Sequence, residues 1–441
     1  MASGTPPLQS PPKPQARALN CPKCGAAIVL RSFGQAITVV CSSCHCILDA
    51  KDPNLAILQQ FAAATKTVAP LIPLGTRGKL RGTDYEVVGF QRRDCKVEGI
   101  TYYWHEYVLF NPYKGIRYLT EYNGHWNDIS ICKTLPLADG GGANYLGEAY
   151  KHFQTTDANT DFVLGEFPWQ VRVDEHAVVT DFVHPPRVLS SEKMDKEVIW
   201  SIGEYMYGAE IWDCFKLPGS PPEAIGVFEN QPSPVAANVS SIWGVFAAFA
   251  LVLLVIMAVS DMRSKKEPVL HEVHQYNRLD AAKNEPSFVT DNFDLSGGTS
   301  TVEVKTFAGV DNHWIYLNYA LISQDTGQAW DFGREVSYYH GYDSDGSWTE
   351  GKQNDSVVIP QVPAGHYYLR VEPEADPALN GVVYSIDVVR DVPVLGIFGF
   401  AFVALLLPAL VISWRAYTFE RSRWTESDHP PMQISTSGDD E

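Results

Sequence analysis

Much of the chain alternates between apolar and polar residues with a period of two, which is the pattern of half-buried β-strands. The alternation begins at Leu74 and is clearest over 99–112, where "GITYYWHEYVLFNP" would send successive side chains to opposite faces of a strand. Glycines separate such runs, and the Asn123-Gly124 pair is a strong signal for a hairpin turn. The pattern therefore predicts a mainly β fold built from short antiparallel strands.

A glycine-rich loop, "ADGGGANYLG", divides this first region in two. We expect β-rich domains at 74–138 and 139–216, each a small antiparallel barrel or sandwich. Six further short runs within 291–390 predict a β-sandwich. The polar stretch 261–290 that precedes them is expected to be an irregular linker.

Two long apolar runs flank the expected sandwich. No charged side chain occurs within 230–260 or within 392–414. A helix needs about 20 such residues to cross a hydrocarbon layer of about 30 Å. A buried core helix is the alternative, but core helices of this length usually keep a polar face. The runs therefore predict transmembrane helices at 241–260 and 392–414, the second of them kinked at Pro408.

The remaining segments connect these units. Residues 51–73 are expected to form a helical linker, because Leu55, Leu58 and Phe61 fall on one side of a helix. The expected organisation is a disordered arm (1–19), a zinc ribbon (20–50), the helical linker (51–73), the two β-rich domains (74–138 and 139–216), a proline-rich tether (217–240), the first transmembrane helix (241–260), a linker (261–290), the outer sandwich (291–390), the second transmembrane helix (392–414) and a cytoplasmic tail (415–441).

Five of the eight cysteines lie close together near the N-terminus. Cys21 and Cys24 form one Cys-x-x-Cys pair, and Cys41 and Cys44 form another. Two such turns present four thiolates toward one point, as tetrahedral Zn²⁺ requires. We predict that these four residues bind one structural zinc ion and that Cys46 is a spare thiol. A redox dithiol is the competing interpretation, and the nearness of Cys46 leaves the fourth ligand open between Cys44 and Cys46.

Charge and cysteine usage bear on location. The formal net charge of −18 opposes binding to nucleic acids or anionic lipids. No apolar signal segment follows Met1, and the stretch between the apolar runs has no cysteine. Three basic residues after Ser260 favour a cytoplasmic position for that flank. The long unsignalled N-terminal part and its thiols favour the opposite and carry more weight, so both termini are expected in the cytoplasm and residues 261–391 outside it.

Catalytic signatures are absent from the sequence. It contains no glycine-rich phosphate loop, no nucleophile elbow and no Cys/His nucleophile pair. An enzyme whose site is not encoded in a short motif stays an alternative, with His105, His125 and Asp128 as the residues to inspect. A second alternative is a nucleic-acid-binding zinc ribbon, helped by the basic N-terminal arm but opposed by the acidic bulk.

Several long phrases resemble bacterial proteins of domain-of-unknown-function family 4178. They are "GTRGKLRGTDYEVVGFQRR", "GITYYWHEYVLFNPYKGIRYLTEYNGHW", "YKHFQTTDANTDFVLGEFPWQV" and "EVIWSIGEY", in that order. The resemblance runs from about Leu74 to Phe215. It implies a bacterial protein in which a zinc ribbon precedes the family domain and a membrane-anchored tail follows it. The family has no established activity, so the resemblance implies no catalytic residues.

Together these observations favour a non-enzymatic protein of the bacterial cytoplasmic membrane. The zinc ribbon and the β-rich domains are expected to bind a protein partner encoded nearby. The outer sandwich is expected to sense or contact something in the envelope. Structural Zn²⁺ is the one cofactor that the sequence predicts.

Overall fold

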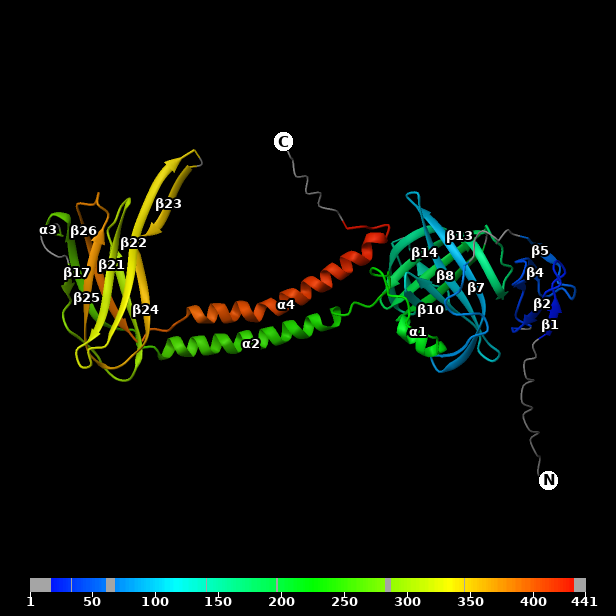
Figure 1. Cartoon of the computed structure of the whole chain (residues 1–441), viewed down its shortest axis with the longest axis horizontal. Helices are drawn as coiled ribbons and strands as arrows, with labels where there is room; N and C mark the ends of the chain where they lie inside the picture. Colours follow the sequence, from blue (N-terminus) through cyan, green and yellow to red (C-terminus); the bar gives the residue numbers. More distant parts are fainter. Residues whose placement is uncertain are drawn as a thin grey trace, which may run out of the picture. The chain divides into compact units, whose positions relative to one another are not determined.

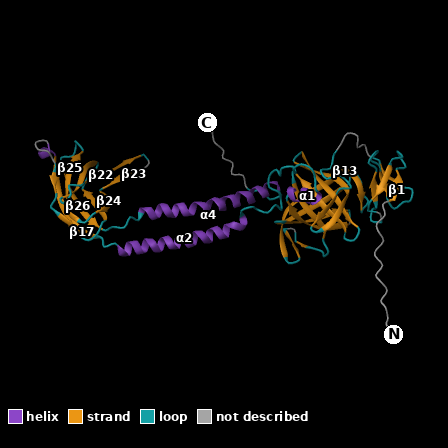
Figure 2. Ribbon diagram, turned by 60° about the horizontal axis from the view of Figure 1, so that its bottom comes forward, coloured by secondary structure: helices purple, strands orange, loops and turns teal. Residues whose placement is uncertain are grey.

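The computed structural model describes residues 17–32, 34–60, 68–139, 141–195, 197–281, 287–344 and 346–431. The fold is mainly β, as the alternating pattern predicted (Figure 2). The chain divides into two compact units, one made of residues 1–237 with 412–441 and the other of residues 238–411. The predicted disordered arm lies outside the described residues except for its last three, which belong to a strand.

The N-terminal ribbon consists of short antiparallel strands. β1 (Arg17–Asn20) pairs with β2 (Ala27–Leu30), while β3 (Thr38–Val40), β4 (Ile47–Asp49) and β5 (Ile57–Gln59) pair in that order. β5 takes the place of part of the predicted helical linker, whose residues 61–67 lie outside the described part. An isolated helix of this length is marginal in water, whereas β4 offers β5 a ready ladder partner.

Eight long strands form a closed antiparallel barrel (Figure 1). Around the ring they are β7 (Thr83–Val97), β8 (Ile100–Asn111), β9 (Gly115–Tyr122), β10 (His125–Ile131), β16 (Glu197–Met206), β15 (Arg187–Met194), β14 (His176–His184) and β13 (Glu148–Phe167). Pairing of β13 with β7 closes the ring. Strands of both predicted β-rich domains share this one barrel, because β10 pairs with β16 across the expected boundary.

Smaller elements cover the barrel and extend its sheet. β6 (Arg77–Leu80) pairs with β7, and the hairpin of β11 (Leu137–Ala138) and β12 (Gly142–Tyr145) pairs with β13. The short helix α1 (Gly208–Phe215) buries Ile211, Trp212 and Phe215 against the barrel. β3 of the ribbon pairs with the end of β13, so the ribbon continues the sheet of the barrel.

Two long helices contain the two apolar runs. α2 (Ala236–Arg263) and α4 (Gly396–Arg423) are long and apolar enough to cross a membrane, by length and composition. Only 6% of the most apolar window of each helix is buried, so their apolar side chains are largely exposed. The helices run side by side in both views, and the rings of Phe246 and Phe402 meet edge-on, 5.5 Å apart (Figure 1, Figure 2). α4 continues through Pro408 and leads into a short 3-10 helix, η2 (Trp424–Glu426).

The segment between these helices forms a β-sandwich, as the sequence predicted. One sheet contains β17 (Glu267–Asn277), β26 (Gly381–Arg390), β20 (Ser300–Ala308) and β24 (Asn354–Val362). The other contains β18 (Phe288–Val289), β19 (Phe293–Leu295), β25 (Gly365–Ala375), β21 (His313–Ser323), β22 (Ala329–Asp343) and β23 (Gly346–Lys352). Buried residues of both sheets, such as Val304, Leu317 and Ile386, form one core.

The sandwich begins earlier than the sequence indicated. β17 and the short helix α3 (Arg278–Ala281) lie within 261–290, the range predicted to be an irregular linker. β17 is mostly exposed and polar, and its conformation is set by a long antiparallel ladder with β26. The partner strand follows it by about a hundred residues in the sequence, so the local pattern contains little sign of the pairing.

Candidate metal centre

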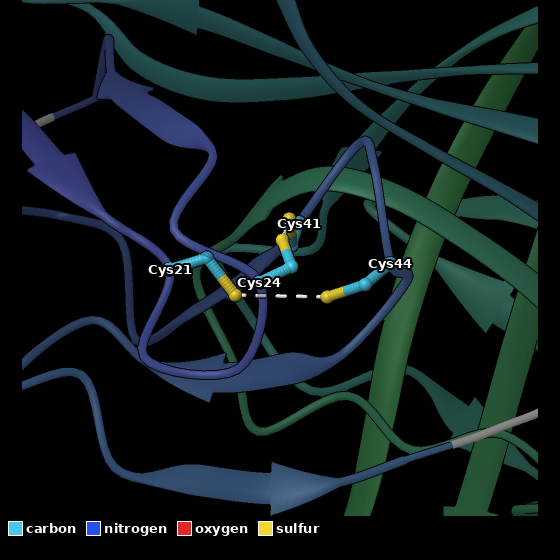
Figure 3. A group of neighbouring side chains, drawn as sticks. All are labelled: Cys21, Cys24, Cys41 and Cys44. Carbon is cyan, nitrogen blue, oxygen red and sulfur yellow. Dashed lines mark hydrogen bonds between the residues drawn. The ribbon is translucent and has the colours of Figure 1, made fainter.

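The structure brings together the four cysteines predicted to bind metal (Figure 3). The Sγ atoms of Cys21 and Cys44 lie 3.6 Å apart, those of Cys24 and Cys41 lie 3.7 Å apart, and all four lie within 4.8 Å of one another. Tetrahedral zinc with Zn–S bonds of about 2.3 Å requires S···S distances of about 3.8 Å. The four residues therefore fit a closed four-thiolate site, and they have the geometry to bind a metal ion.

Two equivalent turns position these thiols. In the first, the Gly25 N–H donates to the Cys21 carbonyl at 2.9 Å, and in the second the His45 N–H donates to the Cys41 carbonyl at 2.8 Å. Gly25 and His45 both have positive φ, 74° and 55°. His45 is therefore the turn residue of the second knuckle, at the position that glycine occupies in the first.

Cys46 lies outside the group of four. Its side chain is fully buried in the small apolar core of the ribbon, beside Leu30 and Leu48. The Cys46 carbonyl accepts the N–H of Cys41 at 3.0 Å, which closes the second turn. The structure thus gives Cys46 a packing position and leaves Cys44 as the fourth thiol of the cluster.

The protein environment favours the thiolate at one position of the cluster. Burial raises the pKa of Cys21, but the N–H groups of Cys24 and Lys23 outweigh it and lower that pKa to about 7. Burial also raises the pKa of Cys41. Four thiolates this close would repel one another, so a divalent cation is the natural means of ionising all four.

The ribbon is bonded to the barrel by a buried carboxylate. Glu166 of β13 is 2% exposed, and its two oxygens accept the N–H groups of Arg31 and Ser32 at 2.6 and 2.8 Å. The Ser32 hydroxyl donates to the same carboxylate. Arg31 also pairs with Glu86 of β7 at 2.7 Å. The loop between β2 and β3 is therefore held against the barrel wall by β13 and β7.

The three residues named for an enzymatic alternative have separate partners. His105 pairs with Glu121 at 2.6 Å. His125 is buried between the Tyr205 hydroxyl and the Ile225 carbonyl, at 2.9 and 3.0 Å. Burial lowers the pKa of His125. The carboxylate of Asp128 is paired with the guanidinium groups of Arg81 and Arg117. The three side chains have different hydrogen-bond and ion-pair partners, although the charge of Glu121, the partner of His105, also acts on His125.

A charged cluster inside the barrel was not found from the sequence. Arg93 of β7 pairs with Glu192 of β15 at 2.7 Å, although β13 and β14 lie between these strands. Their side chains therefore meet across the inside of the barrel. Glu106 of β8 lies 3.6 Å from the same guanidinium and accepts the Gln91 amide at 2.5 Å. The alternating pattern shows which residues share a face, but not that the sheet closes.

Comparisons with curated proteins and with solved structures do not identify the chain. No curated protein matches the chain. Two solved structures are titled "Structure of infectious bursal disease virus Gt strain" and "Structure of infectious bursal disease virus Gx strain". They are 12% and 10% identical, with TM-scores of 0.18 and 0.16, over 81% and 85% of this chain and 66% and 69% of theirs. The match thus spans slightly less than two thirds of the Gt-strain chain. Both TM-scores are too low to indicate a common fold.

The family comparison is specific. The model of the family described as "Domain of unknown function (DUF4178)" matches residues 73–207. This range begins just before β6 and ends just after β16, so it contains every strand of the closed barrel. It confirms the resemblance noted in the sequence. The barrel of this chain is therefore a DUF4178 domain.

Proposed function

We propose that this chain is a non-enzymatic protein of the bacterial cytoplasmic membrane, whose barrel binds a protein partner and whose ribbon holds a structural zinc ion. The observation that carries the proposal is the closed four-cysteine cluster on a ribbon that shares a sheet with the barrel. Four thiolates fill the coordination shell of zinc and leave no open position for a substrate. The metal then stabilises the ribbon that extends the barrel sheet.

An exposed leucine surface on the barrel supports partner binding. Leu135, Leu137 and Leu146, on and beside the β11–β12 hairpin, are each at least three-quarters exposed. Exposed apolar side chains grouped in this way are typical of protein contact sites. The partner is expected to present a complementary apolar surface to this hairpin.

The exposed apolar side chains of α2 and α4 support the membrane assignment. Trp414 and Tyr417 are also exposed, near the end of α4, where aromatic side chains favour a membrane interface. The basic flank after α2 is weaker than its sequence indicates, because Lys266 pairs with Asp261 at 2.7 Å. This one ion pair weakens the charge argument against the orientation with both termini in the cytoplasm and the sandwich outside.

Elemental analysis of the purified full chain tests the metal. About one equivalent of zinc per chain is expected on the four-ligand geometry. Cys41→Ser should lose the metal, and Cys46→Ser should keep it because Cys46 lies in the apolar core of the ribbon. Zinc loss in Cys46→Ser with retention in Cys44→Ser would overturn the ligand set.

Cysteine labelling tests the orientation. Ser344 lies in the exposed turn between β22 and β23. In a Ser344→Cys variant, the new thiol should react with a membrane-impermeant maleimide in intact cells or spheroplasts. A cysteine within the first sixteen residues should react only after lysis. Labelling of the N-terminal arm in intact cells, with Ser344→Cys protected, would reverse the topology.

Co-purification in mild detergent tests the partner. A specific protein is expected to remain bound to the full chain and to be lost from a Leu135→Ser/Leu137→Ser variant. A Leu279→Ser variant, whose exposed leucine lies on the sandwich unit, serves as the matched control and should retain the partner. Recovery of no specific partner, together with a turnover activity, would contradict the proposal.

A further inference from the structure

One end of the barrel is covered by two segments that adjoin the apolar helices. The first, 225–231, precedes α2, and the second, 423–429, follows α4. Both segments belong to the same compact unit as the barrel. They are called the closing segments below.

The first closing segment is bonded to β10. Because a carbonyl only accepts, His125 donates its Nε2–H to the Ile225 carbonyl, at 3.0 Å, and its ring stacks on Phe228 with centroids 5.3 Å apart. Asn230 is fully buried and donates its amide to the Asn127 Oδ1 at 2.7 Å and to the Pro186 carbonyl at 3.0 Å. The segment is therefore held at this end of the barrel by directional bonds.

Arg423 joins the two closing segments. Its side chain is 1% exposed, although it lies at the end of a helix. The guanidinium donates to the carbonyls of Phe228, Glu229 and Gln231 at 2.6–2.9 Å, and to both oxygens of Glu420 at 3.0 Å. These bonds use all five N–H donors that an arginine has. Arg423 thus connects the end of α4 to the segment that leads into α2.

The second closing segment lies on the first half of β13. The Trp424 ring packs on Phe153, with centroids 5.5 Å apart. The Asp428 N–H donates to the Phe153 carbonyl at 2.9 Å, and the Asp428 carboxylate accepts the Thr155 N–H at 2.8 Å. Both closing segments are therefore bonded to barrel strands as well as to each other.

The first closing segment contains a buried carboxyl group. The Oε2 atom of Glu229 is buried and has no hydrogen-bond partner in the part of the chain that the structure describes. Asp181 of β14 is the like charge that acts on it, and Arg423 the opposite one. Asp181 in turn interacts electrostatically with Glu192 and Arg93, the pair that crosses the barrel interior. A negative charge on Glu229 would therefore face Asp181, in an interior where Glu106 and Glu192 already share Arg93.

We propose that the two closing segments are a latch that Arg423 holds shut over the charged interior of the barrel, and that the buried carboxyl of Glu229 is the group whose charge opens it. Loss of the Glu229 proton places a second buried negative charge beside Asp181, and the repulsion loosens both segments. Since the segments adjoin the two apolar helices, the latch links the helix ends to the state of the barrel interior.

The direction of the pH effect follows from the burial. Burial, and next the Asp181 charge, raise the pKa of Glu229 well above its ordinary value, against the opposing effect of Arg423. Burial likewise raises the pKa of Asp181. Acids whose pKa is raised in the closed state stabilise that state at low pH, and this stabilisation is lost as pH rises toward the raised pKa. The latch should therefore loosen as pH rises.

Hydrogen exchange of the full chain in detergent, corrected for intrinsic rates, tests the latch between pH 6 and 9. The reporters are the amides of Ile225 and Asp428, which donate to the carbonyls of Asn123 and Phe153. Their protection should fall by up to about tenfold per pH unit in the chain with native Glu229, as one released proton allows. Amides paired between β8 and β9 should keep their protection, which separates local opening from unfolding.

Matched variants decide the outcome. Glu229→Gln should keep both reporters protected at every pH, and Glu223→Gln, in an exposed position nearby, should behave as the native chain. Asp181→Asn should make the loss of protection smaller, because it removes the like charge that raises the pKa of Glu229. Arg423→Gln should lower protection in both segments by about tenfold or more at every pH. The same pH response in Glu229→Gln as in the native chain, or loosening of only one segment in Arg423→Gln, would overturn the latch.

Discussion

Gly165 of β13 lies directly opposite Gly89 of β7 at the seam that closes the barrel. A Cβ atom on Gly165 would lie 2.2 Å from the Val88 carbonyl oxygen, and one on Gly89 would lie 2.3 Å from the Glu166 carbonyl oxygen. Gly165 also pairs with Val40 of β3 on its other side. The same glycine therefore joins the barrel seam and the ribbon, and no larger residue fits there without moving a backbone.

Gly165→Ala is expected to destabilise the barrel. Gly165 has φ of +83°, which L residues rarely adopt, and the added methyl meets backbone. The strain and the clash together should cost about 2–5 kcal/mol of unfolding free energy, measured by urea denaturation with tryptophan fluorescence. Gly147→Ala is the matched control, because its φ is +86° with open space around it, and it should cost only about 1 kcal/mol. Equal losses in the two variants would show that the seam is not tightly packed.

Glu166→Gln is expected to loosen the ribbon from the barrel. The variant replaces a buried carboxylate that accepts three hydrogen bonds from Arg31 and Ser32 with an amide that accepts fewer. The loss should be about 1–3 kcal/mol and appear as faster hydrogen exchange of the Arg31 and Ser32 amides. Glu98→Gln, at an exposed hairpin tip, should leave these amides unchanged. Unchanged exchange in Glu166→Gln would mean that the β3–β13 ladder alone holds the ribbon.

Removal of the metal is expected to unfold the ribbon and leave the barrel folded. About thirty residues cannot bury enough apolar surface to fold without the metal. A strong chelator should abolish the exchange protection of β1 to β4, while amides paired between β8 and β9 remain protected. Acidification should have the same effect, because protonation of the thiolates releases the metal. A ribbon that stays protected after the metal is gone would contradict a structural role.

Asp128→Asn is expected to lower stability, because Asp128 has a structural role. Its side chain is fully buried between Arg81 and Arg117, which are 42% and 28% exposed. Breaking the pair should cost about 2–4 kcal/mol, below the value for a fully buried network because water reaches both arginines. Asp84→Asn, which changes an exposed residue near the start of β7, is the control. A stable Asp128→Asn variant that lost a measurable turnover would instead favour the enzymatic alternative.

The sandwich is expected to be most stable at mildly acidic pH. All five histidines of residues 238–411 are described, and each lies within 3.1 Å of a carboxylate oxygen. The side chain of Asp325 raises the pKa of His366, and the His366 N–H, followed by its side chain, lowers the pKa of Asp325. The Ala378 N–H, and next His313, lower the pKa of Asp376.

The sign of this pH dependence follows from both partners. A histidine with a raised pKa contributes stability below about pH 6.5 that is lost as pH rises through its folded pKa. An aspartate with a lowered pKa contributes stability above about pH 4 that is lost as pH falls through its folded pKa. The unfolding temperature of the sandwich should therefore peak between these values, and His366→Gln should flatten the alkaline side. A peak above pH 7.5 would show that the pairs do not contribute.

Features encoded by neighbouring residues were predictable from the sequence. Two Cys-x-x-Cys pairs determine a four-thiol cluster, because each turn constrains its own two sulfurs. Alternation of apolar and polar residues determines strands, and two uncharged runs of this length determine long apolar helices. In each case the information lies within one turn or one element, so the pattern can be read without knowing the fold.

Features that depend on distant partners were decided only by the tertiary structure. The β-rich ranges 74–138 and 139–216 read as two domains, yet they form one barrel because β10 pairs with β16 and β13 pairs with β7. Arg423 looks like an ordinary basic residue after an apolar helix, yet it is buried against carbonyls almost two hundred residues earlier in the chain. Hydrogen-bond ladders and buried charges are satisfied by whichever groups the fold brings near, and the local sequence does not encode which groups those are.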